Sequence, residues 1–168
     1  ADIASQEASS EDDQPRSAGA VQSAETSDEQ HWFDLYPRRS KPKLPLPEGV
    51  VLAETPGEYL NQPDKSRLVW IPPGVFELGS DWLEGEQPRR KITLSQGFFI
   101  GKFEVTWSQY ERYCTLTGIS PPERSMLRRG QLFVAGDDHP VFNVFDVQAR
   151  AYCDWAQGRL PSEVEWEY

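Results

Sequence analysis

The chain has 168 residues and a formal charge of −10, and it is long enough to hold one ordinary domain. Residues 1–30 contain eight acidic residues and one basic residue, a charge of −7, so about −3 remains for the other 138 residues. A balance so close to neutral argues against a nucleic-acid-binding face, which needs clustered Lys and Arg. No apolar run approaches the twenty residues that cross a bilayer, so we expect no membrane span.

Two segments precede the predicted domain. Residues 1–30 have only Ile3 and Val21 as aliphatic residues beyond alanine, which predicts a disordered acidic tail, either a solvated linker or an interaction tail. Five prolines between residues 37 and 56 disfavour helix and sheet interiors, so residues 31–67 are interpreted as a transition, with folded structure beginning near Arg67. For domain organisation, we place a tail and proline-rich linker at 1–48 and a domain at 49–168.

An aromatic stretch at residues 31–36 lies inside this transition. We interpret it as a small anchor that holds the linker against the domain, with a partner-binding motif as the alternative. Residue 1 is Ala and no signal-peptide pattern follows it, which leaves the compartment open, with export or a place in the cell envelope among the alternatives.

Short alternating segments predict strands in the first half of the domain. Residues 68–72 form a strand candidate, and residues 75–79 suit its hairpin partner. After an acidic loop at 81–87, residues 91–95 and 98–105 predict two more strands.

A first helix is predicted from Thr106, because Thr106 and Gln109 have the spacing of a capping box. Trp107, Tyr110 and Cys114 then recur at i, i+3 and i+7, which gives one apolar stripe, and Gly118 suits the C-terminal stop. Cys114 on that stripe is interpreted as a small buried hydrophobic residue.

The remainder predicts one strand and two helix starts. Residues 119–139 are interpreted as irregular and residues 140–144 as a strand. Asp146 is predicted to cap a second helix, with Val147, Ala151 and Trp155 on its apolar stripe and Tyr152 beside them. A second capping box spans residues 162–165. Short strands with few helices predict the α+β class.

The residues able to do chemistry form no convergent set, and we assign no catalytic, cofactor-binding or metal-binding residue. His139 precedes a proline and is interpreted as a hydrogen-bonded turn residue. Arg159 could stack on Trp155 or pair with a carboxylate, with substrate contact as a third reading. The carboxylates near the strand end and the last helix form no evident acid–base pair; they are Glu104, Glu163, Glu165 and Glu167.

Five stretches, taken together and in order, resemble the sulfatase-modifying-factor family, to which formylglycine-generating enzyme belongs. They are F-E-L-G-S at 76–80, E-Q-P-R-R-K-I-T-L at 86–94, F-I-G-K-F-E-V-T-W-S-Q-Y at 99–110, D-H-P-V at 138–141, and A-Y-C-D-W at 151–155 with R-L-P-S-E-V-E-W-E-Y at 159–168. The resemblance covers residues 67–168. It implies a C-type-lectin-like fold, of which this chain holds the N-terminal half to two-thirds.

The resemblance also implies a function: oxidation of a cysteine in a protein or peptide substrate to formylglycine by an oxidoreductase. In the family, copper is held by a cysteine pair and calcium by loops that would both lie beyond Tyr168. Cys153 matches a position that is a structural disulfide partner in secreted members. The chain departs from the family pattern at Trp107 and at residues 144–149 and 157–158, which indicates a divergent member. The alternative is a non-catalytic lectin-like binding or scaffold module.

Overall fold

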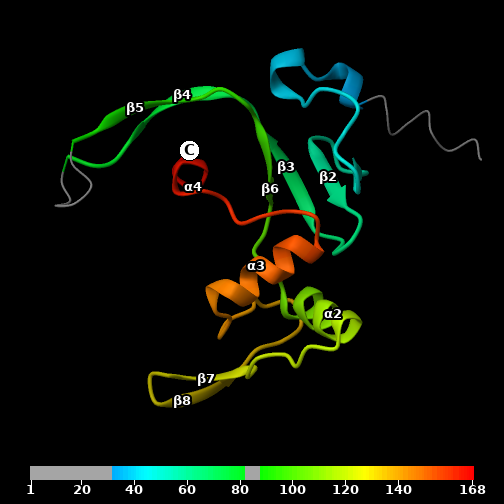
Figure 1. Cartoon of the computed structure of the whole chain (residues 1–168), viewed down its shortest axis with the longest axis vertical. Coiled ribbons are helices and arrows are strands. Elements are labelled where there is room, and N and C mark those ends of the chain that lie inside the picture. The colour runs from blue at the N-terminus through cyan, green and yellow to red at the C-terminus, as the bar shows by residue number, and fades with distance from the viewer. Residues whose placement is uncertain (1–31, 82–87) are drawn as a thin grey trace, which may run out of the picture.

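The computed structural model describes residues 32–81 and 88–168. The predicted acidic tail at 1–30 and nearly all of the acidic loop at 81–87 therefore lie outside the described residues. Figure 1 shows three separate groups of strands with the helices α2 and α3 between them. The mixture of antiparallel strands and short helices confirms the predicted α+β class.

The largest sheet is antiparallel and has the order β1-β2-β3-β6. Its strands are β1 (Val50–Leu52), β2 (Glu58–Asn61), β3 (Arg67–Ile71) and β6 (Phe98–Gly101). The prediction that folded structure begins near Arg67 is therefore wrong, because two strands precede that residue. The prolines of this region lie between the elements, so they remove no ladder hydrogen bond from β1 or β2.

The predicted hairpin between residues 68–72 and 75–79 is also wrong. β4 (Gly74–Leu78) pairs with β5 (Arg90–Leu94), while β2 and β6 occupy the two edges of β3. In Figure 1 the β4–β5 hairpin arches away from the four-stranded sheet. The strand predicted over 98–105 ends at Gly101.

The first helix is confirmed in detail. α2 (Trp107–Thr117) begins at the Thr106 capping box and ends at Gly118, whose φ of 73° is left-handed. Its predicted stripe of Trp107, Tyr110 and Cys114 is buried, and Tyr113 joins it.

A hairpin occupies part of the segment that was predicted to be irregular. β7 (Ser125–Arg128) and β8 (Gln131–Val134) are joined by two residues, Arg129 and Gly130, with φ of 52° and 79°. Two consecutive positive φ values are typical of the tight type I′ turn, whose twist matches that of the strands. The sequence signal was weak because Arg rather than Asn stands before the glycine.

Residues 140–144 do not form the predicted strand. Within residues 32–81 and 88–168, the bridge between Thr106 and Pro140 is their only ladder contact. Asn143 has a φ of 61°, which interrupts an extended backbone.

The second helix has a different cap and a different buried face from those predicted. α3 (Asp146–Trp155) starts with Asp146 as its first helical residue, and the Gln148 side chain accepts from the backbone N–H of Phe145 at 2.9 Å. Val147 is 71% exposed, whereas Tyr152 and Ala156 are buried. The aromatic side chain of Tyr152, packed on α2, decides the rotation of the helix. α4 (Glu163–Glu167) follows its predicted capping box.

Two hydrophobic clusters form the core of the part of the chain that the structure describes. The first contains Trp32, Phe33 and Tyr59 with partly buried residues of the large sheet. The second contains Tyr110, Tyr113, Cys114, Tyr152 and Ala156, between α2 and α3. Among the described residues, no helix is long and apolar enough to cross a membrane.

The described part of the aromatic anchor, residues 32–36, is confirmed. Trp32 and Phe33 are 8% and 4% exposed, and the indole N–H of Trp32 donates to the carbonyl of Ala53 at 3.1 Å. Lys41 donates to the carbonyl of Phe33 at 2.6 Å. The segment before the sheet is therefore held by both apolar contact and hydrogen bonds.

Candidate functional site

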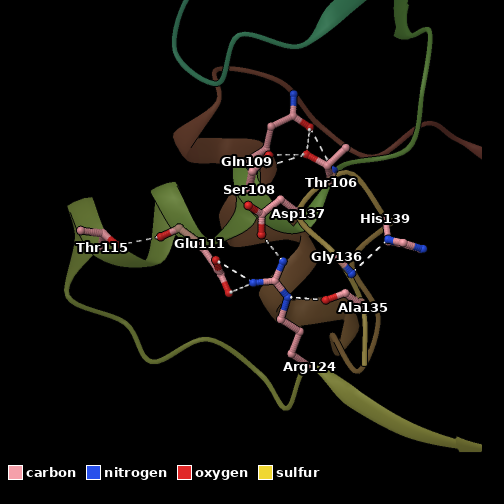
Figure 2. A network of polar contacts seen from close by, with 10 residues as sticks. All are labelled: Thr106, Ser108, Gln109, Glu111, Thr115, Arg124, Ala135, Gly136, Asp137 and His139. Atoms are coloured by element: carbon pink, nitrogen blue, oxygen red, sulfur yellow. Dashed lines mark hydrogen bonds and ion pairs between the residues drawn. The ribbon is translucent and has the colours of Figure 1, made fainter. Parts of the chain in front are cut away.

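The densest polar network of the helical half centres on Arg124 (Figure 2). Its guanidinium donates to the carbonyl of Ala135 at 2.9 Å and to the carboxylate of Glu111 at 3.1 Å, and it pairs with Asp137. It also lies 5.4 Å from the ring of Trp107. These contacts join α2, the start of β7 and the segment after β8, so every donor edge of Arg124 is engaged within the chain.

The same segment closes the N-terminus of α2. The Thr106 N–H donates to the side chain of Gln109 at 2.9 Å, and the N–H groups of Trp107 and Ser108 donate to the carbonyls of His139 and Asp137, both at 3.0 Å. The first N–H groups of a helix otherwise lack partners and attract anions. In this structure those N–H groups have hydrogen-bond partners within the chain. The N-terminus of α2 is therefore bonded to residues 137–139 and offers no anion site.

His139 is a hydrogen-bonded turn residue, as predicted. Its Nδ1 accepts from the N–H of Gly136 at 3.0 Å, which leaves the proton of the neutral imidazole on Nε2. Figure 2 shows Nε2 directed away from the network. Beside it lies a shallow hollow of about 280 Å³; its lining is Met126, Arg128, Phe133, His139, Pro140, Val141 and Phe142. In this state the ring can donate one hydrogen bond at the edge of an apolar hollow.

A second polar cluster, buried between the large sheet and the helices, was not anticipated. The carboxylate of Asp64 is 5% exposed and accepts from Asn61 at 2.8 Å and from the N–H and hydroxyl of Ser66 at 3.0 and 2.8 Å. Its other oxygen accepts from the hydroxyl of Tyr152 at 2.9 Å. Asn61 donates in addition to the carbonyl of Ala156 at 2.9 Å. The cluster therefore ties the β2–β3 turn to α3.

The environment of this cluster favours the neutral form of the tyrosine. Burial raises the pKa of Tyr152, and the neighbouring Asp64 carboxylate raises that pKa further. A tyrosine that stays protonated remains a hydrogen-bond donor, which is the role the geometry requires. The arrangement stabilises the fold and leaves no lone base facing solvent.

Both cysteines are poor nucleophiles in this structure. Cys114 is 2% exposed, Cys153 is half-buried, and neither is in a disulfide within the chain. Burial is the largest cause that raises the pKa of each thiol, and the acids Glu111 and Asp154 add to the effect. A raised pKa lowers the thiolate fraction that reacts or binds metals. The buried hydrophobic role of Cys114 is confirmed, and the structural role of Cys153 stays a prediction.

The metals implied by the family resemblance do not fit the residues in hand. Residues 32–81 and 88–168 contain no group of three or more His, Cys, Asp or Glu side chains that could hold an ion. Copper sites of the family type use thiolates, and burial raises the pKa of both thiols here. We therefore derive no chemical step through copper or calcium from these residues.

Arg159 pairs with a carboxylate, which was one of its predicted roles. Its two terminal nitrogens donate to the two oxygens of Glu165 at 2.7 and 2.6 Å. Glu165 also accepts from the N–H of Ser162 at 2.8 Å, which completes the α4 capping box. The carboxylate is thus committed to holding the start of α4, while Glu104, Glu163 and Glu167 are exposed.

The Arg159–Glu165 pair leads to a pH prediction. The Arg159 guanidinium, helped by the Ser162 N–H, lowers the pKa of Glu165 to about 2. Because the folded-state pKa is lowered from 4.5, the stabilisation by this carboxylate is complete above pH 4.5 and is lost as the pH falls toward 2. We expect the substitution Arg159→Gln to raise the pKa of Glu165 toward its ordinary value. Carboxyl-carbon NMR titration measures this, and an unchanged Glu165 titration in Arg159→Gln would contradict the assignment.

The chain is similar to a family model and to several known proteins. The family model described as "Sulfatase-modifying factor enzyme 1-like domain" matches residues 55–168. Formylglycine-generating enzyme from Bos taurus is 30% identical over 156 residues, which cover 67% of this chain and 41% of that protein. Inactive C-alpha-formylglycine-generating enzyme 2 from Bos taurus is 29% identical over 143 residues, which cover 60% of this chain and 47% of that protein.

A solved structure is similar as well. PvdO from Pseudomonas aeruginosa superimposes with a TM-score of 0.47 at 24% sequence identity, over 61% of this chain and 44% of that one. The chain thus spans less than half the length of each of these relatives.

Proposed function

Because the chain belongs to the sulfatase-modifying-factor family, we propose that its full-length protein is an oxidoreductase of the formylglycine-generating type. The substrate would be a cysteine in a target protein, oxidised to formylglycine. The observation that carries the proposal is the continuous family match over residues 55–168, together with 30% identity to the bovine formylglycine-generating enzyme.

In this proposal the chain contributes the scaffold of the domain. The Asp64 cluster joins the large sheet to α3, and the Arg124 network joins α2 to the β7–β8 hairpin. Both sets of polar groups have partners within the chain and so act by holding these elements in place. We assign the copper-binding cysteine pair to the part of the family domain that this chain does not span.

A non-catalytic binding or scaffold module is the second candidate. The inactive bovine relative is 29% identical to this chain, almost as similar as the active one at 30%. Identity over this part of the domain therefore does not separate the two functions.

Turnover by the full-length protein distinguishes the candidates. The protein is loaded with copper and incubated in air with a cysteine-containing peptide, and the aldehyde product is trapped with a hydrazide and identified by mass spectrometry. We expect copper-dependent product from the cysteine peptide and none from its serine counterpart. Absence of product from the folded, copper-loaded protein would favour the binding module.

The variant Cys153→Ala tests the placement of the chemistry. We expect it to retain turnover, because burial raises the pKa of the Cys153 thiol and the proposal assigns it a structural role. Unchanged circular dichroism with complete loss of turnover would instead give Cys153 a direct part in the reaction.

A further inference from the structure

The aromatic anchor lies on a row of aromatic rings that belongs to the large sheet. An edge-to-face series runs through Trp32, Tyr59, Phe99 and Trp70, with successive centroid distances of 5.7, 4.9 and 5.0 Å. Such contacts are favourable beyond the area that they bury. Trp32 is one end of the series, and Tyr59 is only 2% exposed. The three sheet residues therefore form an aromatic socket, and the anchor fills it.

The anchor is held in the socket by its side chains, in the way that a bound peptide is held. Residues 32–36 belong to no strand of the sheet. The Phe33 side chain is buried, and its carbonyl accepts from the Lys41 ammonium at 2.6 Å. The same ammonium lies 4.5 Å from the centroid of the Phe33 ring. A few buried aromatic side chains carry most of the energy of such interfaces, so Trp32 and Phe33 are the determinants of docking.

The anchor and the socket come from different parts of the chain. The family model matches residues 55–168, which include Tyr59, Trp70 and Phe99. Trp32 and Phe33 precede that match by more than twenty positions. The socket is thus part of the family domain, while its occupant is supplied by the segment in front of it. Residues 1–30, with their charge of −7, join the domain through this segment.

An exposed connection separates the anchor from β1. Lys43, Leu44 and Pro45 are exposed, Leu44 by 65%. After them, the carbonyl of Gly49 accepts from the N–H of Gln62 at 2.7 Å, and β1 pairs with β2. Each side of the connection therefore has its own contacts with the domain.

We propose that residues 32–41 are a releasable clasp, bound in the aromatic socket as a noncovalent peptide ligand. The partner that the socket fits is a short peptide with two adjacent aromatic residues, and this chain supplies that peptide itself. When bound, the clasp fixes the point at which the acidic N-terminal residues join the domain. The proposal does not depend on the proposed oxidase function, because it uses no catalytic group.

Cutting the connection in the full-length protein tests the clasp. A recognition sequence for a specific protease is inserted between Lys43 and Leu44, and the cut protein is passed through gel filtration at micromolar concentration. We expect the N-terminal fragment to co-elute with the domain. An excess of a synthetic peptide of residues 32–43 should displace it. The same peptide with Trp32→Ala should compete at least about tenfold more weakly.

Matched variants separate docking from general effects of substitution. In the cut protein, Phe33→Ala should raise the dissociation rate of the fragment at least about tenfold, and Lys41→Gln should raise it about fivefold. Leu35→Ala, at a position that is 71% exposed, and Lys43→Gln should leave it unchanged. Release of the parent fragment on cutting, retention that the peptide cannot reverse, or equal release by Leu35→Ala would overturn the proposal. Competition by the peptide uses the parent domain, so it decides the matter even if a variant fails to fold.

Discussion

Replacement of Asp64 by alanine should lower the free energy of unfolding by roughly 3–5 kcal/mol. The substitution leaves the donors of Asn61, Ser66 and Tyr152 facing a buried site without an acceptor. Each unsatisfied buried donor costs about 1–3 kcal/mol, and relaxation around the site recovers part of the sum. Urea unfolding followed by circular dichroism measures the change.

Tyr152→Phe is the matched control for this cluster. It removes one hydroxyl donor and keeps the ring that packs on Tyr110 and Tyr113, so we expect a smaller loss of about 1–2 kcal/mol. In the double variant the two losses should not add, because both act on one hydrogen-bond network. Strict additivity, or a loss for Asp64→Ala no greater than that for Tyr152→Phe, would refute the idea that Asp64 organises the cluster.

Replacement of Gly97 by alanine should also cost roughly 2–3 kcal/mol. A Cβ atom at Gly97 would lie 2.3 Å from the ring of Trp70 and 2.5 Å from the carbonyl oxygen of Ile71. The ring packs against Phe99 in the first hydrophobic cluster, and the carbonyl belongs to β3, so neither can withdraw without disturbing the sheet. Thermal unfolding measures the loss, and altered tryptophan fluorescence should accompany it.

Gly158→Ala provides the comparison for this substitution. The closest atom to a Cβ at Gly158 is the Cys153 carbonyl oxygen at 3.9 Å, which is an ordinary contact. We expect a change in stability within about 0.5 kcal/mol. If the two variants proved equally stable, the close approach of Trp70 and Ile71 to Gly97 could not be the reason for glycine at that position.

The helix starts could be predicted from the sequence because their stabilising contacts are local. The Thr106 and Ser162 boxes each join residues three apart, so the pattern contains both partners of the bond. The predicted cap of α3 was Asp146, but the N-cap is Phe145. Phe145 contributes its backbone N–H, which every residue except proline has, so the residue type does not identify the cap. Alternation of apolar and polar residues identified several strand segments, but it did not identify the strands with which they pair.

The buried Asp64 cluster also could not be predicted from the sequence, because it depends on contacts between residues that are far apart in the chain. Its turn residues Asn61, Asp64 and Ser66 are typical of a polar turn and gave no sign of burial. The partner that completes the cluster, Tyr152, is 88 positions away. His139, by contrast, was correctly assigned to a turn because its acceptor contact with Gly136 spans three residues.

The sequence by itself determined the family, the α+β class, both ends of α2 and the start of α4, since short motifs and contacts within a few residues carry that information. Only the tertiary structure decided that β4 pairs with β5, that Tyr152 rather than Val147 faces the core, and that Leu127 and Leu132 share an exposed face. The physical reason is that strand pairing and helix rotation minimise the free energy of contacts between distant segments. Each local sequence pattern is compatible with several such arrangements, so the pattern alone does not select one.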